Sequence, residues 1–126
     1  MTPEDLLYYK EHEWAKTDDN TAVIGISDYA QDALGDIVYV DLPSVGDKLS
    51  AGAVVGEVES VKSTSELHTP LSGTVTEINQ KVSDTPEIIN NDPYGEGWLF
   101  KIEMDNRDEL NDLMNAKQYE DYIKEL

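Results

Sequence analysis

A lysine within an acidic and hydroxyl-rich segment is the residue of this sequence whose surroundings best suit covalent chemistry. Lys62 lies in the segment Glu57–Leu67 and is the only Lys or Arg residue between Lys48 and Lys81. If the strands on either side of it pair, Lys62 falls near a hairpin tip, where a modifying enzyme reaches the amine without unfolding the domain. A long group joined there through an amide would sweep a large volume from a fixed base. Spacing alone leaves an ordinary exposed lysine on a hairpin as the alternative.

Other kinds of chemistry find little support in the sequence. The chain has no cysteine, which excludes disulfides, thiolate zinc sites and cysteine nucleophiles, so redox chemistry requires an attached group. His12 and His68 form no His-x-x-x-His pair, and the sequence contains neither a calcium-loop pattern nor a glycine-rich phosphate loop. We therefore expect no metal site, and the two histidines to be ordinary surface or partly buried residues. A free-standing enzyme is the less favoured interpretation.

The charge of the chain limits its partners. Nine Lys and Arg residues against 27 Asp and Glu residues give a formal net charge of −18. This field repels nucleic acids and anionic membranes, and it either attracts basic protein surfaces or only maintains solubility. No apolar run approaches the ~20 residues that span a bilayer, and the acidic start Met1–Asp5 is unlike a signal or transit peptide. We expect a soluble cytoplasmic protein that binds neither nucleic acid nor membranes.

Short apolar runs separated by turn formers predict strands along most of the chain. The first two runs, residues 12–16 and 22–26, are predicted to form a hairpin. The later runs are residues 37–42, 53–59, 73–78 and 98–102. Strands this short, broken this often by Pro, Gly, Asn and Asp, indicate a small barrel or sandwich. Similar Gly-led alternation in 55–59 and 72–77 further predicts that these two segments are the strands flanking Lys62.

Helices are predicted in two places. Residues 28–34 are expected to form two helical turns, because Ser27 supplies an N-cap oxygen and Gly35 a C-terminal stop. The residues expected on the inner face of this helix are Tyr29, Ala33 and Leu34. Apolar residues return at helical spacing only after Asp105, which predicts a pair of short C-terminal helices.

The segment Val58–Ser63 resembles the lipoyl-attachment site of the glycine cleavage system H protein family, and other segments resemble the same family in order and spacing. Those segments are residues 12–14, 23–27, 29–31, 34–38, 42–43, 72–75 and 90–98. The resemblance implies a mainly β fold, the barrel-sandwich hybrid of lipoyl and biotinyl proteins, with two small sheets and short peripheral and C-terminal helices. It also implies one lipoyl-carrier domain over residues 1–126, with a lipoyl-bearing core at about 20–103 and C-terminal helices at about 106–124.

The resemblance implies a set of site residues as well. Lys62 would carry a covalent lipoate, whose chain together with the lysine side chain forms a long arm. Glu13 lies in the family segment near which this arm rests when it carries a substrate group. The attaching ligase and the partner enzymes would recognise the residues around the lysine, which are Glu57, Glu59, Ser60, Val61, Ser63 and Glu66. Glu11 stands where many family members have a serine or lysine, which leaves open how this chain cradles a loaded arm.

The function implied by the resemblance is that of a non-catalytic, monomeric carrier, which passes the aminomethyl group of glycine and reducing equivalents between enzymes. The implied partners are a pyridoxal-phosphate-dependent glycine decarboxylase, a tetrahydrofolate-dependent aminomethyltransferase, dihydrolipoyl dehydrogenase and a lipoyl ligase or transferase. One alternative is an H-like protein that relays lipoyl groups to other enzymes. A biotin carrier is more remote, because methionines flank the lysine in that family, whereas Val61 and Ser63 flank Lys62. A phosphopantetheine carrier would need an Asp-Ser-Leu triplet, which this sequence lacks.

Overall fold

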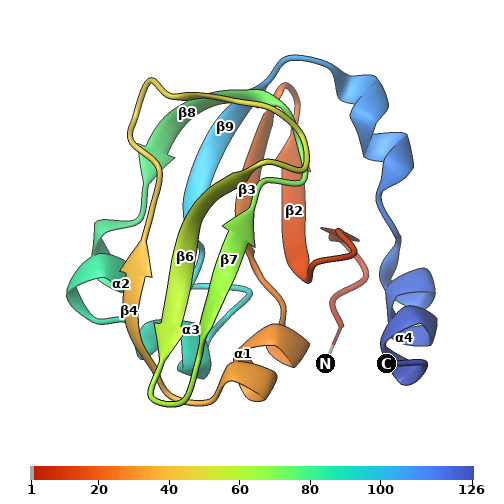
Figure 1. Ribbon diagram of the computed structural model, residues 1–126. Helices are drawn as coiled ribbons and strands as arrows, with labels where there is room; N and C mark the ends of the chain where they lie inside the picture. The colour runs from red at the N-terminus through yellow and green to blue at the C-terminus, as the bar shows by residue number, and fades with distance from the viewer. Residues whose placement is uncertain (1) are drawn as a thin grey trace.

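The computed structural model describes residues 2–126 and consists of two antiparallel β-sheets packed face to face, with short helices at their edges (Figure 1). The larger sheet has six strands, in the spatial order β1 (Leu7–Tyr8), β2 (Glu13–Asp18), β3 (Thr21–Ile26), β9 (Phe100–Met104), β8 (Gly73–Ile78) and β5 (Lys48–Leu49). The smaller sheet has three strands, in the order β4 (Ile37–Asp41), β6 (Val54–Ser60) and β7 (Thr64–His68). The helical segments are α1 (Asp28–Leu34), α2 (Gln80–Asp84), α3 (Ile88–Asn91), the 3-10 helix η1 (Arg107–Asp112) and α4 (Ala116–Lys124). No helix within residues 2–126 has the length and apolar character needed to cross a lipid bilayer.

Alternation along the strands builds a hydrophobic interior between the two sheets. Successive side chains of a strand point to opposite faces, so each strand places every second residue in this space. The buried side chains that fill it from β3, β9 and the smaller sheet are Ala22, Ile24, Ile26, Phe100, Ile102, Met104, Val40, Val58 and Leu67. Each Leu, Ile or Phe that is fully buried stabilises the fold by about 1.5–3 kcal/mol relative to an exposed one. This core fixes how the smaller sheet lies on the larger one.

A second hydrophobic cluster attaches the C-terminal helix to the other face of the larger sheet. Its buried members are Leu6, Tyr8, Trp14, Ala116 and Tyr119. The ring of Tyr8 stacks on that of Tyr119, with 4.6 Å between ring centroids. Two backbone hydrogen bonds of 2.8 Å also join Tyr8 and Met114, just before α4. Strand β1 and helix α4 therefore form one packed unit, although they lie at opposite ends of the chain.

Most of the predicted elements occur in the structure. The hairpin β2–β3, the helix α1, and the strands β4, β6, β8 and β9 have ends within two residues of the predicted bounds. Helix α1 begins after Ser27, whose side chain accepts a hydrogen bond from the Ala30 N–H, and ends at Gly35, as its capping residues predicted. Two short helical segments, η1 and α4, follow β9 as expected.

Two predictions were wrong. The strand that pairs with β6 after Lys62 is β7, whereas residues 72–77 mostly belong to β8 in the larger sheet. Strand β7 escaped prediction because it lies at an edge of the small sheet and has one buried apolar residue, Leu67. The predicted inner face of α1 was wrong for Ala33, which is exposed, whereas Leu34 is partly buried and packs against the core as predicted; no residue of α1 is fully buried. The helix lies at one end of the sandwich, near the tip of the β6–β7 hairpin, rather than across a sheet face (Figure 1).

Candidate functional site

Lys62 lies at the tip of the hairpin formed by β6 and β7. The strands remain paired up to Glu59 and Thr64, which leaves Ser60–Ser63 as the turn. The Ser60 hydroxyl oxygen accepts hydrogen bonds from the backbone N–H groups of Lys62 and Ser63, at 3.3 and 3.1 Å, and the hydroxyl donates to the Ser63 carbonyl at 3.1 Å. Ser60 is 6% exposed, whereas the Lys62 side chain is exposed. A buried hydroxyl therefore holds the backbone of the tip while the amine stands in solvent.

The tip is also hydrogen-bonded to residues 35–37, which follow α1 in the chain. The Val61 N–H donates to the Asp36 carbonyl oxygen at 3.0 Å. Asn90 of α3 holds that segment from the other side, because its Nδ2 donates to the Gly35 carbonyl oxygen at 2.8 Å and its Oδ1 accepts from the Ile37 N–H at 2.9 Å. The base of Lys62 is thus fixed by contacts from three separate parts of the chain.

A cavity of about 230 Å³ lies between α1 and the start of β7, close to Lys62. The stem of Lys62 passes over Gly35, since a Cβ placed on that glycine would stand 3.3 Å from Lys62 Cε. The residues that line the cavity are Glu11, His12, Tyr29, Ala30, Ala33, Leu34 and Ser65. This lining combines an apolar floor from α1 with one carboxylate and one imidazole. A group attached to Lys62 needs only to fold back over Gly35 to reach it.

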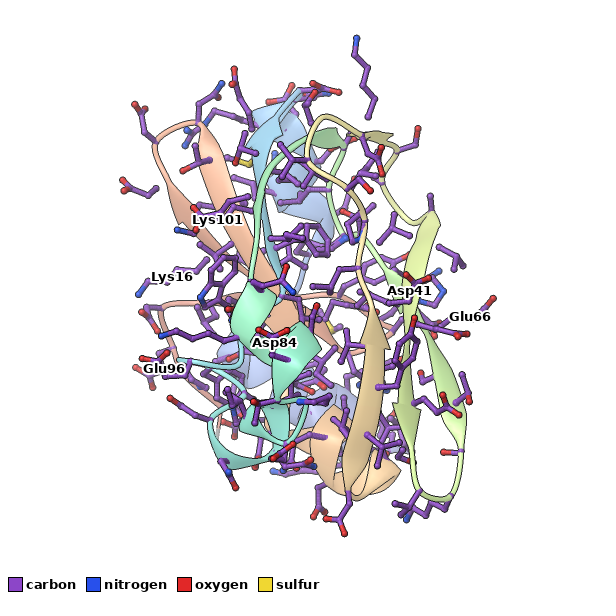
Figure 2. The ribbon with its side chains drawn as sticks, turned by 90° about the vertical axis from the view of Figure 1, so that its left-hand side faces the viewer. Lys16, Asp41, Glu66, Asp84, Glu96 and Lys101 are labelled. Carbon is purple, nitrogen blue, oxygen red and sulfur yellow. The ribbon has the colours of Figure 1, made fainter. Side chains whose placement is uncertain are left out.

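Glu57 is the centre of a row of three carboxylates on the outer face of the small sheet. Its register partners are Asp41 of β4 on one side and Glu66 of β7 on the other. Figure 2 shows Asp41 and Glu66 on the same side of the molecule, with Lys16 and Lys101 on the opposite side. Like charges directly opposite one another destabilise a sheet, and none of the three forms an ion pair within residues 2–126. This face is therefore complementary to a basic surface.

The remaining residues predicted to be recognised lie at the tip or next to it. Glu59 is on the same outer face as Glu57 and two residues nearer the turn. Val61 is 69% exposed, and Ser63 is exposed beside Lys62. Ser60 differs, because its hydroxyl is turned inward and bonds the turn itself. The predicted recognition residues thus lie at the hairpin tip or on the two strands that lead to it. Ser60 stabilises the turn and is not available for contact with a partner.

Glu13 is buried inside the molecule and does not line the cavity. It is 1% exposed and lies at the start of β2, on the inward-facing side. One carboxyl oxygen, Oε2, accepts a hydrogen bond from the His68 backbone N–H at 2.9 Å, while Oε1 has no partner among the described residues. The His68 Nδ1 lies 3.5 Å from Oε2 but is not aligned for a hydrogen bond. Burial raises the pKa of Glu13 to about 8, although the His68 N–H acts in the opposite direction.

Three residues that hold the site were not predicted to belong to it. The sequence marks Gly35 as a helix stop, and Gly35, Asp36 and Asn90 lie in segments that resemble the family, but nothing in the sequence places them at Lys62. Their contacts join segments far apart in the chain, such as the pair Asn90 and Gly35, which are 55 positions apart. Local signals do not predict such contacts. Within residues 2–126 the structure shows no group of His, Asp and Glu residues that could hold a metal ion.

Several known proteins similar to this chain have the same description. The family model for glycine cleavage H-protein matches residues 6–126. A glycine cleavage system H protein of Carboxydothermus hydrogenoformans is 50% identical over 125 residues, which are 99% of this chain and 96% of that protein. The corresponding protein of Alcanivorax borkumensis is 50% identical over 121 residues, which are 96% of this chain and 94% of that protein.

A solved structure agrees in fold. The crystal structure of a glycine cleavage system H protein from Mycobacterium marinum matches with a TM-score of 0.86 and 37% sequence identity, over 98% of this chain and 97% of that chain. This match confirms the predicted mainly β fold, a barrel-sandwich hybrid of two sheets with short helices. Because the family model, the relatives and the solved structure all agree over nearly the whole length, this chain belongs to the glycine cleavage H-protein family.

Proposed function

We propose that Lys62 is the attachment point of a covalent lipoyl group and that the protein is a non-catalytic carrier, whose chemistry resides in that group. As a member of the glycine cleavage H-protein family, the protein is a carrier in the glycine cleavage system. The observation that supports the attachment point is the exposure of Lys62 at a hairpin tip whose backbone a buried serine holds. A lipoyl group supplies a disulfide that reduction can open, and this chain has no cysteine to supply one itself.

The surroundings of Lys62 suit conversion of its amine to an amide. Lys62 forms no ion pair within the described part of the chain, so loss of its charge breaks none. The neighbouring lysines in the sequence lie on other elements, Lys48 on β5 and Lys81 on α2, where Lys81 pairs with Glu96 at 3.4 Å. An attaching enzyme that approaches the hairpin tip therefore meets a single lysine.

The cavity beside Lys62 supports a resting place for the arm. Ala30, Ala33 and Leu34 supply an apolar surface, which would exclude water from the end of the arm. Aminomethyl groups bound to sulfur lose ammonia in water, so this exclusion would protect a loaded arm. Glu13 stays a proposed arm contact, because a donor at the end of the arm would satisfy its buried Oε1. That contact requires local opening, since Oε1 is not accessible from the surface.

The proposal assigns partner contacts to the outer face of the small sheet and to the tip. The enzymes expected to dock there are glycine decarboxylase, aminomethyltransferase, dihydrolipoyl dehydrogenase and the lipoyl ligase or transferase. Each has to bring its active site to the end of an arm that starts at Lys62. The carboxylate row of Asp41, Glu57 and Glu66 would then meet basic residues that surround the entrance of each active site. In this proposal the carrier works as a cytoplasmic monomer, as the family resemblance implies.

The test of the attachment point is an intact-mass measurement of protein incubated with a lipoyl ligase, followed by peptide mapping. We expect one lipoyl addition, located on Lys62. The variant Lys62→Arg should keep its fold and gain no mass, because a guanidinium does not form the amide. Lys48→Arg and Lys81→Arg are the matched controls and should be modified like the parent. A lipoylated peptide that contains another lysine, or a biotinyl mass, would refute the proposal.

A further inference from the structure

Tyr119 joins the C-terminal helix to the cavity beside Lys62. It lies on α4 and is 1% exposed. Its hydroxyl oxygen is 2.8 Å from Nδ1 of His12 and 2.7 Å from Oγ of Ser27. These partners are 107 and 92 positions away in the chain. One hydroxyl therefore connects three distant segments, although no residue of α4 lines the cavity.

Each partner of Tyr119 fixes one wall of the cavity. His12 lines the cavity itself, and its ring centroid is 4.8 Å from that of Tyr29, another lining residue. Its backbone has φ of 79°, a left-handed conformation that is uncommon outside glycine and needs support from its surroundings. Ser27 caps α1, since its Oγ accepts from the Ala30 N–H at 3.2 Å, and its own N–H donates to the His12 carbonyl oxygen at 2.9 Å. The wall formed by α1 and the wall formed by the His12 turn thus meet at Tyr119.

The protonation state of His12 is linked to the direction of the hydrogen bond between Ser27 and Tyr119, in which either hydroxyl can donate. Ser27 and Tyr119 each have one hydroxyl hydrogen to donate. When Ser27 donates to Tyr119, the Tyr119 hydrogen is directed to Nδ1 of His12, which then has no proton of its own. The ring proton is in that case on Nε2. Burial lowers the pKa of His12 and favours this neutral ring, whereas the nearby carboxylate of Glu11 acts in the opposite direction.

We propose that Tyr119 is a positioning residue of the carrier. Through this hydroxyl, α4 holds His12 as the Nε2–H tautomer and keeps the α1 wall and the His12 wall together, so that the cavity retains the arm. The inference rests on the proposed function, since it takes the cavity to be the resting place of an arm on Lys62. It makes the C-terminal helix part of the arm's resting site without any direct contact.

The first test uses the full-length, unlipoylated protein and the variant Tyr119→Phe. This variant keeps the ring that stacks on Tyr8 and removes only the hydroxyl. The readout is the nitrogen NMR spectrum of the labelled imidazoles, which distinguishes the two neutral tautomers and follows the titration of each ring. We expect the parent His12 to be the Nε2–H tautomer and the variant to show a mixture. The pKa of His12 should rise in the variant, because the lost hydrogen bond stabilised the neutral ring.

The matched control is Tyr8→Phe. Tyr8 is a buried tyrosine of the same cluster, and its hydroxyl donates to the Pro3 carbonyl oxygen at 2.7 Å and contacts neither cavity wall. We expect this control to leave the His12 tautomer unchanged. A second variant, His12→Asn, suits the left-handed backbone and removes the imidazole, so in that background Tyr119→Phe should have a smaller effect on ammonia release from the loaded carrier. A near-identical circular dichroism spectrum shows that each variant is folded.

The second test measures ammonia release from the lipoylated and loaded carrier without the transferase. We expect Tyr119→Phe to release ammonia about fivefold faster than the parent, which corresponds to one net hydrogen bond at 25 °C. Tyr8→Phe should release it at the parental rate.

The two tests separate the possible failures. An unchanged His12 tautomer in Tyr119→Phe would refute the hydrogen-bond chain. A changed tautomer with parental ammonia release would refute the control of the cavity by Tyr119. A parent that releases ammonia as fast as the unfolded loaded chain would refute the resting cavity and the role of Tyr119 with it. Lipoylation elsewhere than Lys62, seen by mass, would refute the proposed function while the tautomer result stands.

Discussion

Gly35 lies beneath the side chain of Lys62, so close that a Cβ on Gly35 would stand 3.3 Å from Lys62 Cε and 3.8 Å from Nζ. The same glycine ends α1 with φ of 82° and ψ of −154°, a conformation that is essentially restricted to glycine. The side chain of Lys62 is flexible and can yield by a few tenths of an ångström. The backbone requirement is therefore the stronger of the two constraints.

We predict that Gly35→Ala lowers the free energy of unfolding by about 1–3 kcal/mol through backbone strain. The strain should be partly relieved by a shift of Asp36, which would weaken its hydrogen bond from Val61. Hydrogen exchange of the Val61 amide should then become faster than in the parent. Gly46→Ala is the control, because Gly46 also has a positive φ, of 94°, with nothing within 4 Å of an added Cβ. If both variants left Val61 exchange unchanged, Gly35 would have no part in holding the tip.

Ser60→Ala should loosen the backbone of the hairpin tip without removing Lys62. The variant loses the hydroxyl that bonds the Lys62 and Ser63 N–H groups, and these groups become unsatisfied or solvated. We expect a loss of about 1–2 kcal/mol in urea unfolding and a fall of about fivefold in kcat/KM for lipoylation. Thr64→Val is the matched control, because it removes an exposed hydroxyl beside the turn that makes no hydrogen bond within the described chain and keeps the β-branched shape. Equal lipoylation kinetics for the two variants would contradict this account of the turn.

Glu57→Gln should increase the free energy of unfolding of the carrier and raise the apparent KM of its partner enzymes. Removal of the central charge from the carboxylate row relieves repulsion by Asp41 and Glu66, and the expected gain is about 0.2–1 kcal/mol at low ionic strength. The gain should shrink as salt screens the row. The apparent KM of the partner enzymes for the loaded or lipoylated carrier should rise. Glu103→Gln on the larger sheet is the control, because its register partners are Thr21 and Thr74. A KM that responds equally to both substitutions would show that net charge, and not this face, guides docking.

The buried carboxyl of Glu13 predicts a pH dependence of stability. Burial raises its pKa from an ordinary value of 4.5 to about 8, so between these pH values the folded chain retains a proton that the unfolded chain has released. The unfolded state binds fewer protons in this range, and the free energy of unfolding therefore falls as pH rises through it. Glu13→Gln should remove this slope and exceed the parent in stability at pH 8, by an amount on the order of a few kcal/mol. Glu87→Gln, a change at an exposed carboxyl that does not act on Glu13, should keep the parental slope in thermal melts across the same pH range. Parallel profiles for parent and Glu13→Gln would mean that Glu13 is ionised in the folded protein.

The sequence was most informative where structure depends on neighbouring residues. The limits of α1 follow from Ser27 and Gly35, which act on backbone groups within one helical turn. The hairpin tip at Lys62 was also predicted, although its second strand was assigned to 72–77. The actual strand, β7, is polar apart from Leu67, and it is held in place by pairing with β6 more than by its own pattern.

The chemical groups of the candidate site were predicted, but the long-range contacts that hold them in place were not. The position of Lys62 and the carboxylates around it followed from the sequence and the family resemblance. The burial of Glu13 did not, because it depends on β7 placing the His68 N–H over its carboxyl, 55 positions away. The contact between Tyr119 and His12 spans 107 positions, and the left-handed backbone of His12 has no local signal such as glycine. Lipoate on Lys62, the recognition residues and the extent of the domain remain predictions.

When the proposed arm on Lys62 folds back into the cavity, it closes a ring with the protein. The hydrogen bond from Val61 to Asp36 completes that ring on the protein side. It joins the residue before Lys62 to the residue two positions after Leu34, which lines the cavity, so one hydrogen bond holds the two ends of the ring near each other. The free energy of closing the ring then depends on the rotatable bonds of the lysine and the arm, and motion between protein segments contributes little. Each added rotatable bond increases the entropy lost on closure only slightly, whereas an arm too short to span the gap never closes. For the proposed carrier, the length of the arm therefore sets the entropy lost when the arm returns, while contacts with the cavity walls set how long it then stays away from water.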